Sequence, residues 1–195
     1  MKKGTIWIII IAIIALVVMW FVRINNSMGG AQEQTVQAWA QVENVYQRRA
    51  DLIPNLVNTV KGAANFEKGT LEAVIEARSR ATSVTVDPTN LTEESMAAFQ
   101  NAQDDLSKSL GRLMAVVESY PELKANQNFL ELQAQLEGTE NRIAVERRTF
   151  NQVVQAYNVL IRKFPNSIVA GMRNFESKAY FEAAEGAETP PVVEF

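Results

Sequence analysis

Residues 4–22 read GTIWIIIIAIIALVVMWFV, nineteen positions without one charged side chain. At a helical rise of 1.5 Å per residue they extend roughly 28 Å, close to the ~30 Å hydrocarbon core of a bilayer. The run is longer than the apolar part of a cleaved signal peptide, and it is apolar on every face, unlike a helix of a soluble core. We therefore expect one membrane-spanning helix, whose residues include Thr5, Trp7, Ile10, Ile14, Val17, Trp20 and Val22.

The charges that flank this run predict its orientation. Lys2, Lys3 and the α-amino group precede it, whereas Arg23 follows it and the next basic residue is Arg48. The positive-inside rule places the more basic flank in the cytoplasm. The charge count thus predicts a cytoplasmic N-terminus and a soluble domain outside the cytoplasm.

Composition excludes several classes of function. The net charge of −3 argues against nucleic-acid binding, which needs a basic surface. The chain has no Cys and no His, so it lacks the usual residues of a disulfide framework, a triad hydrolase or a zinc site. Adjacent carboxylates such as Asp104 and Asp105 diverge by about 100° on a helix and do not form a joint ligand set. We expect no cofactor, no metal and no enzymatic activity.

The chain divides into four parts by composition. Residues 1–24 form the predicted anchor, and residues 25–31 (NNSMGGA) read as a polar linker and hinge with paired glycines. Residues 32–181 form one helical domain. Residues 182–195 carry only acidic charges and end near Pro190-Pro191, which predicts a flexible acidic tail.

Apolar residues recur at intervals of three and four along most of the domain, which is typical of amphipathic helices. The first such stripe runs from Trp39 to Ala63 and contains Pro54, which predicts either a kink or a break where Asp51 caps a new helix. Further helices are expected at 70–81, from a Thr92–Ser95 cap to Pro121, and at 168–175.

The helix before Pro165 has a strict seven-residue repeat, as in left-handed bundles. The fold class predicted from these patterns is all-α, with a single N-terminal transmembrane helix followed by an antiparallel four- to five-helix bundle. The repeat consists of Phe129, Leu136, Ile143, Phe150, Tyr157 and Phe164.

Charged residues interrupt two of these stripes. A charge buried in a helical core is costly unless it is paired, so we predict that Arg49 pairs with Glu140 or Glu146. The favoured interpretation is a polar layer that fixes helix register. A binding site for a small anion or a peptide carboxylate, and simple solvent exposure, are the alternatives. The residues expected in the layer are Arg49, Asp51, Glu140, Glu146 and Arg147.

Several segments resemble the LemA family of bacterial membrane-anchored proteins. The resemblance begins at RRADLIPNLVNTVKG (48–62), continues through EARSRAT (76–82), 118–151 and YNVLIRKFP (157–165), and ends at PPVVEF. It implies an all-helical bundle in the bacterial cytoplasmic membrane and brings no established catalytic residue to carry over. The family commonly has a histidine where this chain has Phe66, and it implies an external N-terminus, opposite to the charge count.

Three functions are compatible with these features. The favoured hypothesis is a membrane-anchored, non-enzymatic scaffold or protein-interaction module, with the lipid bilayer, a second copy of the chain and an unknown envelope protein as partners. The alternative is an adaptor or sensor at the cell envelope that binds a peptide or partner, with its own tail as a strand or plug. A hydrolytic enzyme is the third, but no spacing of residues singles out a catalytic set.

Overall fold

A computed structural model describes residues 3–62 and 66–182. In these residues all regular secondary structure is helical, which confirms the predicted all-α class. The helices are α1 (Lys3–Lys61), α2 (Lys68–Ser83), α3 (Glu93–Val117), α4 (Pro121–Lys124), α5 (Gln127–Arg162) and α6 (Asn166–Arg173).

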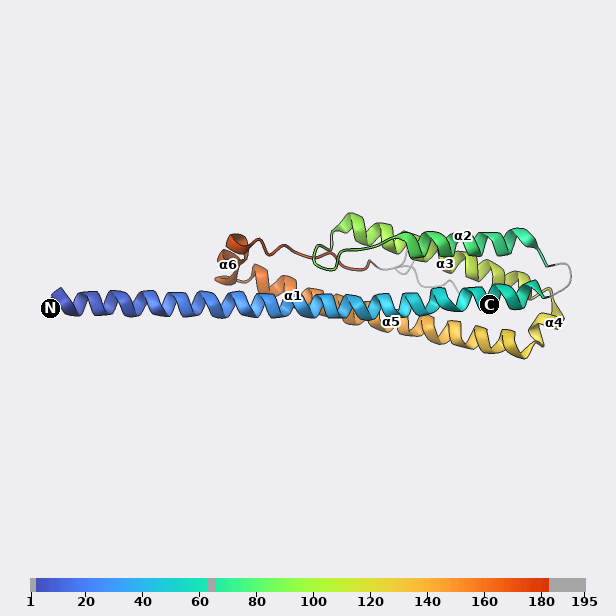
Figure 1. Cartoon of the computed structure of the whole chain (residues 1–195), viewed down its shortest axis with the longest axis horizontal. Helices are drawn as coiled ribbons and strands as arrows, with labels where there is room; N and C mark the ends of the chain where they lie inside the picture. Colours follow the sequence, from blue (N-terminus) through green and yellow to red (C-terminus); the bar gives the residue numbers. More distant parts are fainter. Residues whose placement is uncertain (1–2, 63–65, 183–195) are drawn as a thin grey trace, which may run out of the picture.

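The first helix is the longest element of the molecule. At 1.5 Å per residue its 59 residues extend roughly 88 Å, and Figure 1 shows its N-terminal part projecting alone beyond the other helices. This projecting part is long and apolar enough to cross a membrane. Residues 4–20 and Val22 are exposed to the surroundings of the protein, as lipid contact requires, and Phe21 is half-buried against the domain.

The predicted linker at 25–31 is not a break in the chain. These residues are helical and belong to α1, so the membrane segment and the domain share one helix. The side chain of Met28 is fully buried, and it continues the stripe formed by Thr35, Trp39 and Val42. Helical packing of Met28 therefore overrides the turn preference of the neighbouring asparagines and glycines.

Pro54 does not break α1 either, and Asp51 is an exposed residue inside the helix, not the cap of a new one. A proline cannot donate to the carbonyl four residues earlier, which here is that of Ala50. The Arg78 side chain of α2 supplies the missing donor, with its Nε 2.7 Å from the Ala50 carbonyl oxygen. A contact between two helices thus replaces the lost backbone hydrogen bond.

The connection between α2 and α3 is a loop held by local hydrogen bonds. Asp87 begins a turn in which its carboxylate accepts hydrogen bonds from the Thr89 backbone and hydroxyl. Thr92 is the N-cap of α3, and it forms a capping box with Ser95. The capping box confirms the helix start predicted at Thr92 and Ser95.

The heptad repeat of α5 lies in the core up to Tyr157. Phe164, its last expected member, follows the end of the helix and is 77% exposed, so its placement in the bundle core is wrong. Beyond α6, Asn174 adopts a left-handed backbone conformation with φ of 55°, which ends the helix and turns the chain back along the domain.

Four long helices pack as two pairs. In Figure 1, α5 returns antiparallel alongside α1, and α3 returns alongside α2. The α2–α3 pair joins the first pair through contacts between α1 and α2. The domain is therefore elongated along α1.

The interior consists of three apolar clusters that follow one another along α1. The distal core lies farthest from the membrane segment, the central core is rich in aromatic rings, and the proximal core adjoins the membrane segment. The distal core includes Ile53, Leu56, Val60, Leu71, Val74, Leu106, Leu113, Phe129 and Leu136. The central core includes Trp39, Val42, Tyr46, Phe99, Phe150, Val154 and Phe181, and the proximal core consists of Met28, Tyr157, Ile161, Val169 and Ala170.

Candidate functional site

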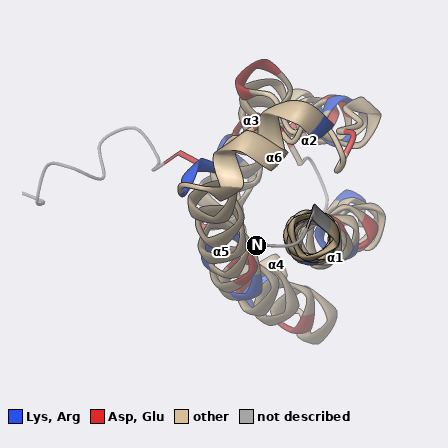
Figure 2. Ribbon diagram, turned by 90° about the vertical axis from the view of Figure 1, so that its left-hand side faces the viewer, with Lys and Arg blue, Asp and Glu red and all other residues tan. Residues whose placement is uncertain are grey.

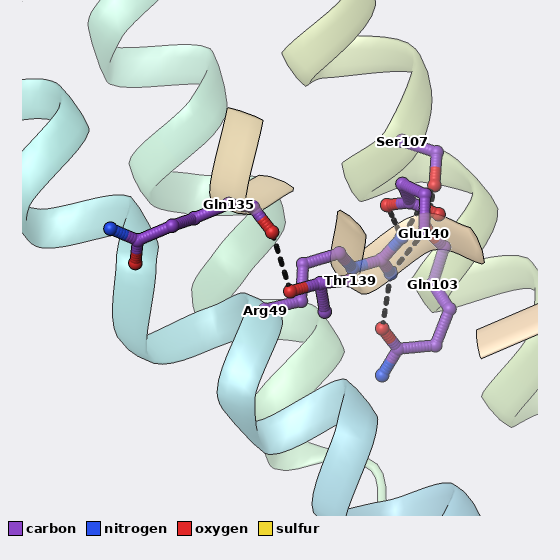
Figure 3. Close-up of polar contacts among 6 residues, drawn as sticks. All are labelled: Arg49, Gln103, Ser107, Gln135, Thr139 and Glu140. Carbon is purple, nitrogen blue, oxygen red and sulfur yellow. Dashed lines mark hydrogen bonds and ion pairs between the residues drawn. The ribbon is translucent and has the colours of Figure 1, made fainter. Parts of the chain in front are cut away.

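Arg49 lies on α1 between the central and distal cores and is only 1% exposed. Figure 3 shows its guanidinium reaching toward α3 and α5. Solvent exposure, one of the interpretations open from the sequence, is therefore wrong for this residue. A buried cation needs acceptors for its five N–H groups, so its partners determine what the site can do.

The acceptors around Arg49 come from two helices. Its Nη1 donates to Glu140 Oε1 and to Ser107 Oγ, both at 2.7 Å. Its Nη2 donates to Gln103 Oε1 at 2.6 Å and to the Gln103 carbonyl at 3.1 Å. Of the two carboxylates considered from sequence, the structure thus places Glu140 beside Arg49 (Figure 3).

The network extends to a fourth helix through Gln103. Its Nε2 donates to the Ala81 carbonyl of α2, so one side chain joins Arg49 on α1 to α2 and α3. Gln103 is a polar residue within an apolar stripe, and this pattern is the feature of the sequence that could have indicated its role in the network. The sequence alone does not connect Gln103 with Arg49. With these acceptors in place, the two Nη atoms of Arg49 are engaged by the protein and not by an external anion.

Three residues expected in this layer lie elsewhere. Asp51 is exposed and accepts a hydrogen bond from Gln47. Glu146 is half-buried and forms no ion pair within the described residues. Arg147 extends toward the C-terminal segment, where its Nη2 donates to the Glu182 carbonyl. Asp51 and Glu146 point away from the layer because each helical residue is rotated by about 100° from the one before it. Arg147 lies seven residues after Glu140, so it is on the same side of α5 but roughly 10 Å farther along the helix.

Tyr46 lies against the Arg49 guanidinium, and its phenol has a raised pKa. The Arg49 guanidinium carbon lies 5.1 Å from the centre of the Tyr46 ring, a cation–π distance. Burial raises the pKa of the Tyr46 phenol, and the positive charges of Arg147 and Arg49 partly offset this effect. The phenol is thus held neutral and acts as a packing group.

A second polar cluster holds the extended segment 174–182 against the helices. The Asn158 amide both donates to the Lys178 carbonyl and accepts from the Lys178 N–H, each at 2.9 Å. Asn151, seven residues earlier on α5, makes the same pair of bonds with Phe181. Gln100 of α3 does so with Glu182. Side-chain amides thereby satisfy the backbone of this segment as a neighbouring strand would.

Phe181 anchors the segment in the central core. Its ring stacks on Trp39 at 5.9 Å between centroids and meets Phe150 edge-on at 5.4 Å. The Arg147 guanidinium covers the same ring at 4.7 Å. Aromatic contacts of this kind add to the burial of apolar area, so Phe181 fixes the position of the segment along α5.

Lys178 is the buried charge of the segment. Its Nζ donates to the carbonyls of Pro88 and Thr89 at 3.1 and 2.8 Å, and lies 5.6 Å from the Tyr157 ring centre. Burial lowers the pKa of the Lys178 ammonium, and the nearby Asp87 carboxylate partly offsets this. Hydrogen bonds from Thr89 lower the pKa of Asp87 itself.

The described side chains include no group of three or more His, Cys, Asp or Glu residues placed to hold a metal ion. Most of the predicted acidic tail lies outside the described residues, and Glu182 is the part of it that the structure places. The two polar clusters are organised around hydrogen bonds between helices and around an extended peptide segment.

Comparison with known proteins adds a family and three relatives. The model of the LemA family matches residues 38–195. Protein LemA of Metamycoplasma hominis is 24% identical over 179 residues, which cover 91% of this chain and 78% of that protein.

Two magnetosome proteins are similar over a shorter region. MamQ of Magnetospirillum gryphiswaldense is 34% identical, and MamQ 1 of Paramagnetospirillum magneticum 33% identical, each over 93 residues. The matched region covers 48% of this chain and only 34% of each of those proteins.

Proposed function

Because the chain belongs to the LemA family, whose model covers residues 38–195, we propose that it is a membrane-anchored, non-enzymatic interaction protein. The observation that carries this proposal is the continuity of α1. One helix contains the apolar membrane segment and also contributes to all three cores. A domain joined in this way presents its surfaces at a fixed distance from the bilayer, which suits a scaffold.

The chemistry of the domain supports a role in contact and not in bond-making. The chain has neither His nor Cys. The most deeply buried charge, Arg49, is engaged by Gln103, Ser107 and Glu140. Its bonds orient helices, and its register role explains why a charge is kept in the interior.

Partner identification tests this proposal most directly. Chemical cross-linking in native membranes followed by mass spectrometry should yield reproducible links between the domain and one envelope protein or a second copy. Light scattering of the detergent-solubilised chain separates these cases, since self-association gives a mass that is a multiple of 21.7 kDa. A monomer without cross-linked partners, or hydrolysis by the purified chain that is lost in an unfolded variant, contradicts the proposal.

The orientation proposed is that of the charge count, with the N-terminus in the cytoplasm and the domain outside it. Asn166 is the first residue of α6. Because the chain has no cysteine, a cysteine introduced at this position is a unique site for a thiol reagent. An impermeant thiol reagent should label this cysteine in intact cells. Labelling only after the cells are broken would reverse the assignment.

A second function, a peptide-binding adaptor, is favoured by the clamped segment 174–182. Lys178 donates to the two carbonyls of Pro88 and Thr89, and Phe181, three residues later, packs among aromatic rings. Side-chain amides bind the backbone of both residues. A partner with lysine and an aromatic residue at the same spacing could replace this segment. A groove of about 830 Å³, lined in part by Met96, Asp104 and Glu176, lies beside it and leaves room for exchange.

Binding of a synthetic peptide tests the adaptor function. In a full-length K178A/F181A variant the contacts that hold segment 174–182 against the helices are weakened. A labelled peptide of residues 174–182 should then bind to the variant, and its fluorescence anisotropy should rise. The same peptide with alanine in place of Lys178 and Phe181 is the matched control. Equal binding of both peptides, or none to a folded variant, contradicts the adaptor function.

A further inference from the structure

The corner formed by the end of α5 and by α6 has an apolar face that no described residue covers. Phe164, Ile168 and Met172 are 77%, 52% and 69% exposed. Ile168 and Met172, four residues apart, lie on one side of α6, and Phe164 lies in the turn that precedes this helix. The opposite side of α6 is buried, where Val169 and Ala170 form part of the proximal core.

This corner lies beside the part of α1 that directly follows the apolar membrane segment. Figure 1 shows α6 at the end of the domain that faces the projecting part of α1. Phe21, within the membrane run, packs against the proximal core. Arg173 Nε donates to Asn25 Oδ1 at 3.0 Å, which fixes α6 to α1 just beyond that run.

The depth of the corner follows from helix geometry. Asn25 lies three residues after Val22, roughly 4.5 Å along the helix axis from the last apolar residue. The headgroup region on each side of the hydrocarbon core is about 5–8 Å thick. When α1 spans the bilayer, Arg173 is therefore at the level of the headgroups.

The charges at this end of the molecule suit an anionic surface. No Asp or Glu occurs in residues 1–32 or in residues 147–175. Arg162, Lys163 and Arg173 flank the apolar face, and Arg23 follows the membrane run. In the end-on view of Figure 2, α6 is tan between basic ends. Basic residues around an apolar face are the pattern of helices that lie in the membrane interface.

We infer that the α5–α6 corner is a second membrane-binding site, which lies in the interface of the same bilayer that α1 spans. Phe164, Ile168 and Met172 enter the boundary between headgroups and acyl chains, and the neighbouring basic side chains contact anionic phosphates. The domain is then held at two points, and its long axis has a fixed direction relative to the membrane. The inference depends on α1 being the membrane span of the proposed function.

Lipid-resident quenchers test this site in the full-length chain. Because the chain lacks cysteine, I168C and M172C each carry one environment-sensitive fluorophore after reconstitution into phosphatidylcholine–phosphatidylglycerol nanodiscs. We expect blue-shifted emission and strong quenching by lipids with a spin label near the headgroup. The matched control is V145C, which is 55% exposed on α5 and roughly 25 Å farther along that helix from Arg162. It should show neither effect.

Two further arms distinguish the possible failures. I14C, within the membrane run, should be quenched by deeply labelled lipids, and absence of this quenching would refute the anchor and the corner together. If I14C is quenched while I168C and M172C behave like V145C, the corner alone is refuted. Labels at the corner that are shielded from water but not reached by lipid quenchers, with cross-links between chains, would assign the face to a second copy instead.

Discussion

Arg49 shows how one charge can specify the arrangement of several helices. Its guanidinium has acceptors only where α3 and α5 present Gln103, Ser107 and Glu140 in register. A shift of α3 would remove the acceptors Gln103 and Ser107, and a shift of α5 would remove the carboxylate of Glu140. Either shift leaves a buried charge with part of its hydrogen bonds unmade, which is costly. The residue therefore penalises wrong packing more than it stabilises the correct one.

A double-mutant cycle tests the Arg49–Glu140 pair. R49M and E140Q should each destabilise the chain, and their effects should be non-additive by about 1–3 kcal/mol, because each removes the same ion pair. The Glu140 side chain is 45% exposed, so water solvates it when Arg49 is absent and the coupling stays moderate. Urea unfolding in detergent measures the four stabilities. E146Q is the control and should be additive with R49M, and additivity for E140Q as well would contradict the pairing.

Lys178 gives a prediction about pH. Its buried ammonium has a pKa below the ordinary lysine value of 10.5, so the unfolded chain binds this proton more tightly than the folded chain does. The Lys178 contribution to stability should therefore rise with pH between its folded pKa and 10.5, and stay constant below that window.

Nuclear magnetic resonance of the Lys178 side chain measures this pKa directly. The D87N variant is the control, because removal of the Asp87 charge should lower the Lys178 pKa further while Asn can still begin the turn. A titration at or above 10.5 in the folded chain would show that the ammonium is not buried.

The sequence predicted Arg49 and Glu140 well but the remaining members of the layer poorly. Arg49 and Glu140 were found because the energetic cost of a buried charge requires a partner. Glu146 was included because it interrupts an apolar position of the heptad pattern, and Asp51 and Arg147 were included because they flank the interrupted positions. The pattern does not show which of these side chains lies at the same level as Arg49. The amide clamps of Asn151 and Asn158 were missed, although their seven-residue spacing placed them on one side of α5.

At the scale of single helices, Pro54 in α1 and Arg78 in α2 act as a unit. In the wild-type chain R78M removes the donor to the Ala50 carbonyl and should cost about 1.5–3 kcal/mol, since the donor is charged. In a P54A background the backbone N–H restored at position 54 can donate to this carbonyl, so R78M should cost less. Thermal unfolding of the four variants provides the measurement, and an equal cost of R78M in both backgrounds would contradict the compensation.

The paired glycines of α1 provide a second test at this scale. No atom outside the helix backbone lies within 4 Å of a Cβ built on Gly29 or Gly30, so alanine fits at both. G29A/G30A should stabilise the helix by up to about 1 kcal/mol per site and slow amide hydrogen exchange there. Since proline inside a helix costs about 3 kcal/mol or more, G30P should have the opposite effect. Faster exchange in the alanine variant would indicate a non-helical linker.

The same region shows why a helix can be hidden in a sequence that resembles a linker. NNSMGGA has the composition of a turn, and local preference alone favours a hinge. Phe21, Ile24, Met28 and Ala31 nevertheless recur at intervals of three and four, and all four contact the proximal core. The other buried members of this core belong to α5 and α6, more than a hundred residues later, so the sequence of the linker alone could not reveal it.

At the scale of the molecule, the continuity of α1 joins the bilayer to the domain. The membrane segment, Met28 of the proximal core and Arg49 all lie on one helix without an interruption. The proposed scaffold and the second membrane contact both depend on this rigid connection. A flexible joint at 25–31 would allow the domain to rotate freely. The domain would then have no fixed distance from the bilayer, and α6 would not be held at the membrane surface.

The distance between spin labels at residues 18 and 47 tests this connection most directly. Val18 is exposed in the membrane segment, Gln47 is exposed in the domain, and the chain has no cysteine to interfere. Twenty-nine residues of helix separate them, so double electron–electron resonance of V18C/Q47C in nanodiscs should give one narrow distribution near roughly 44 Å. A broad distribution centred at shorter distances would show that α1 bends freely between membrane and domain.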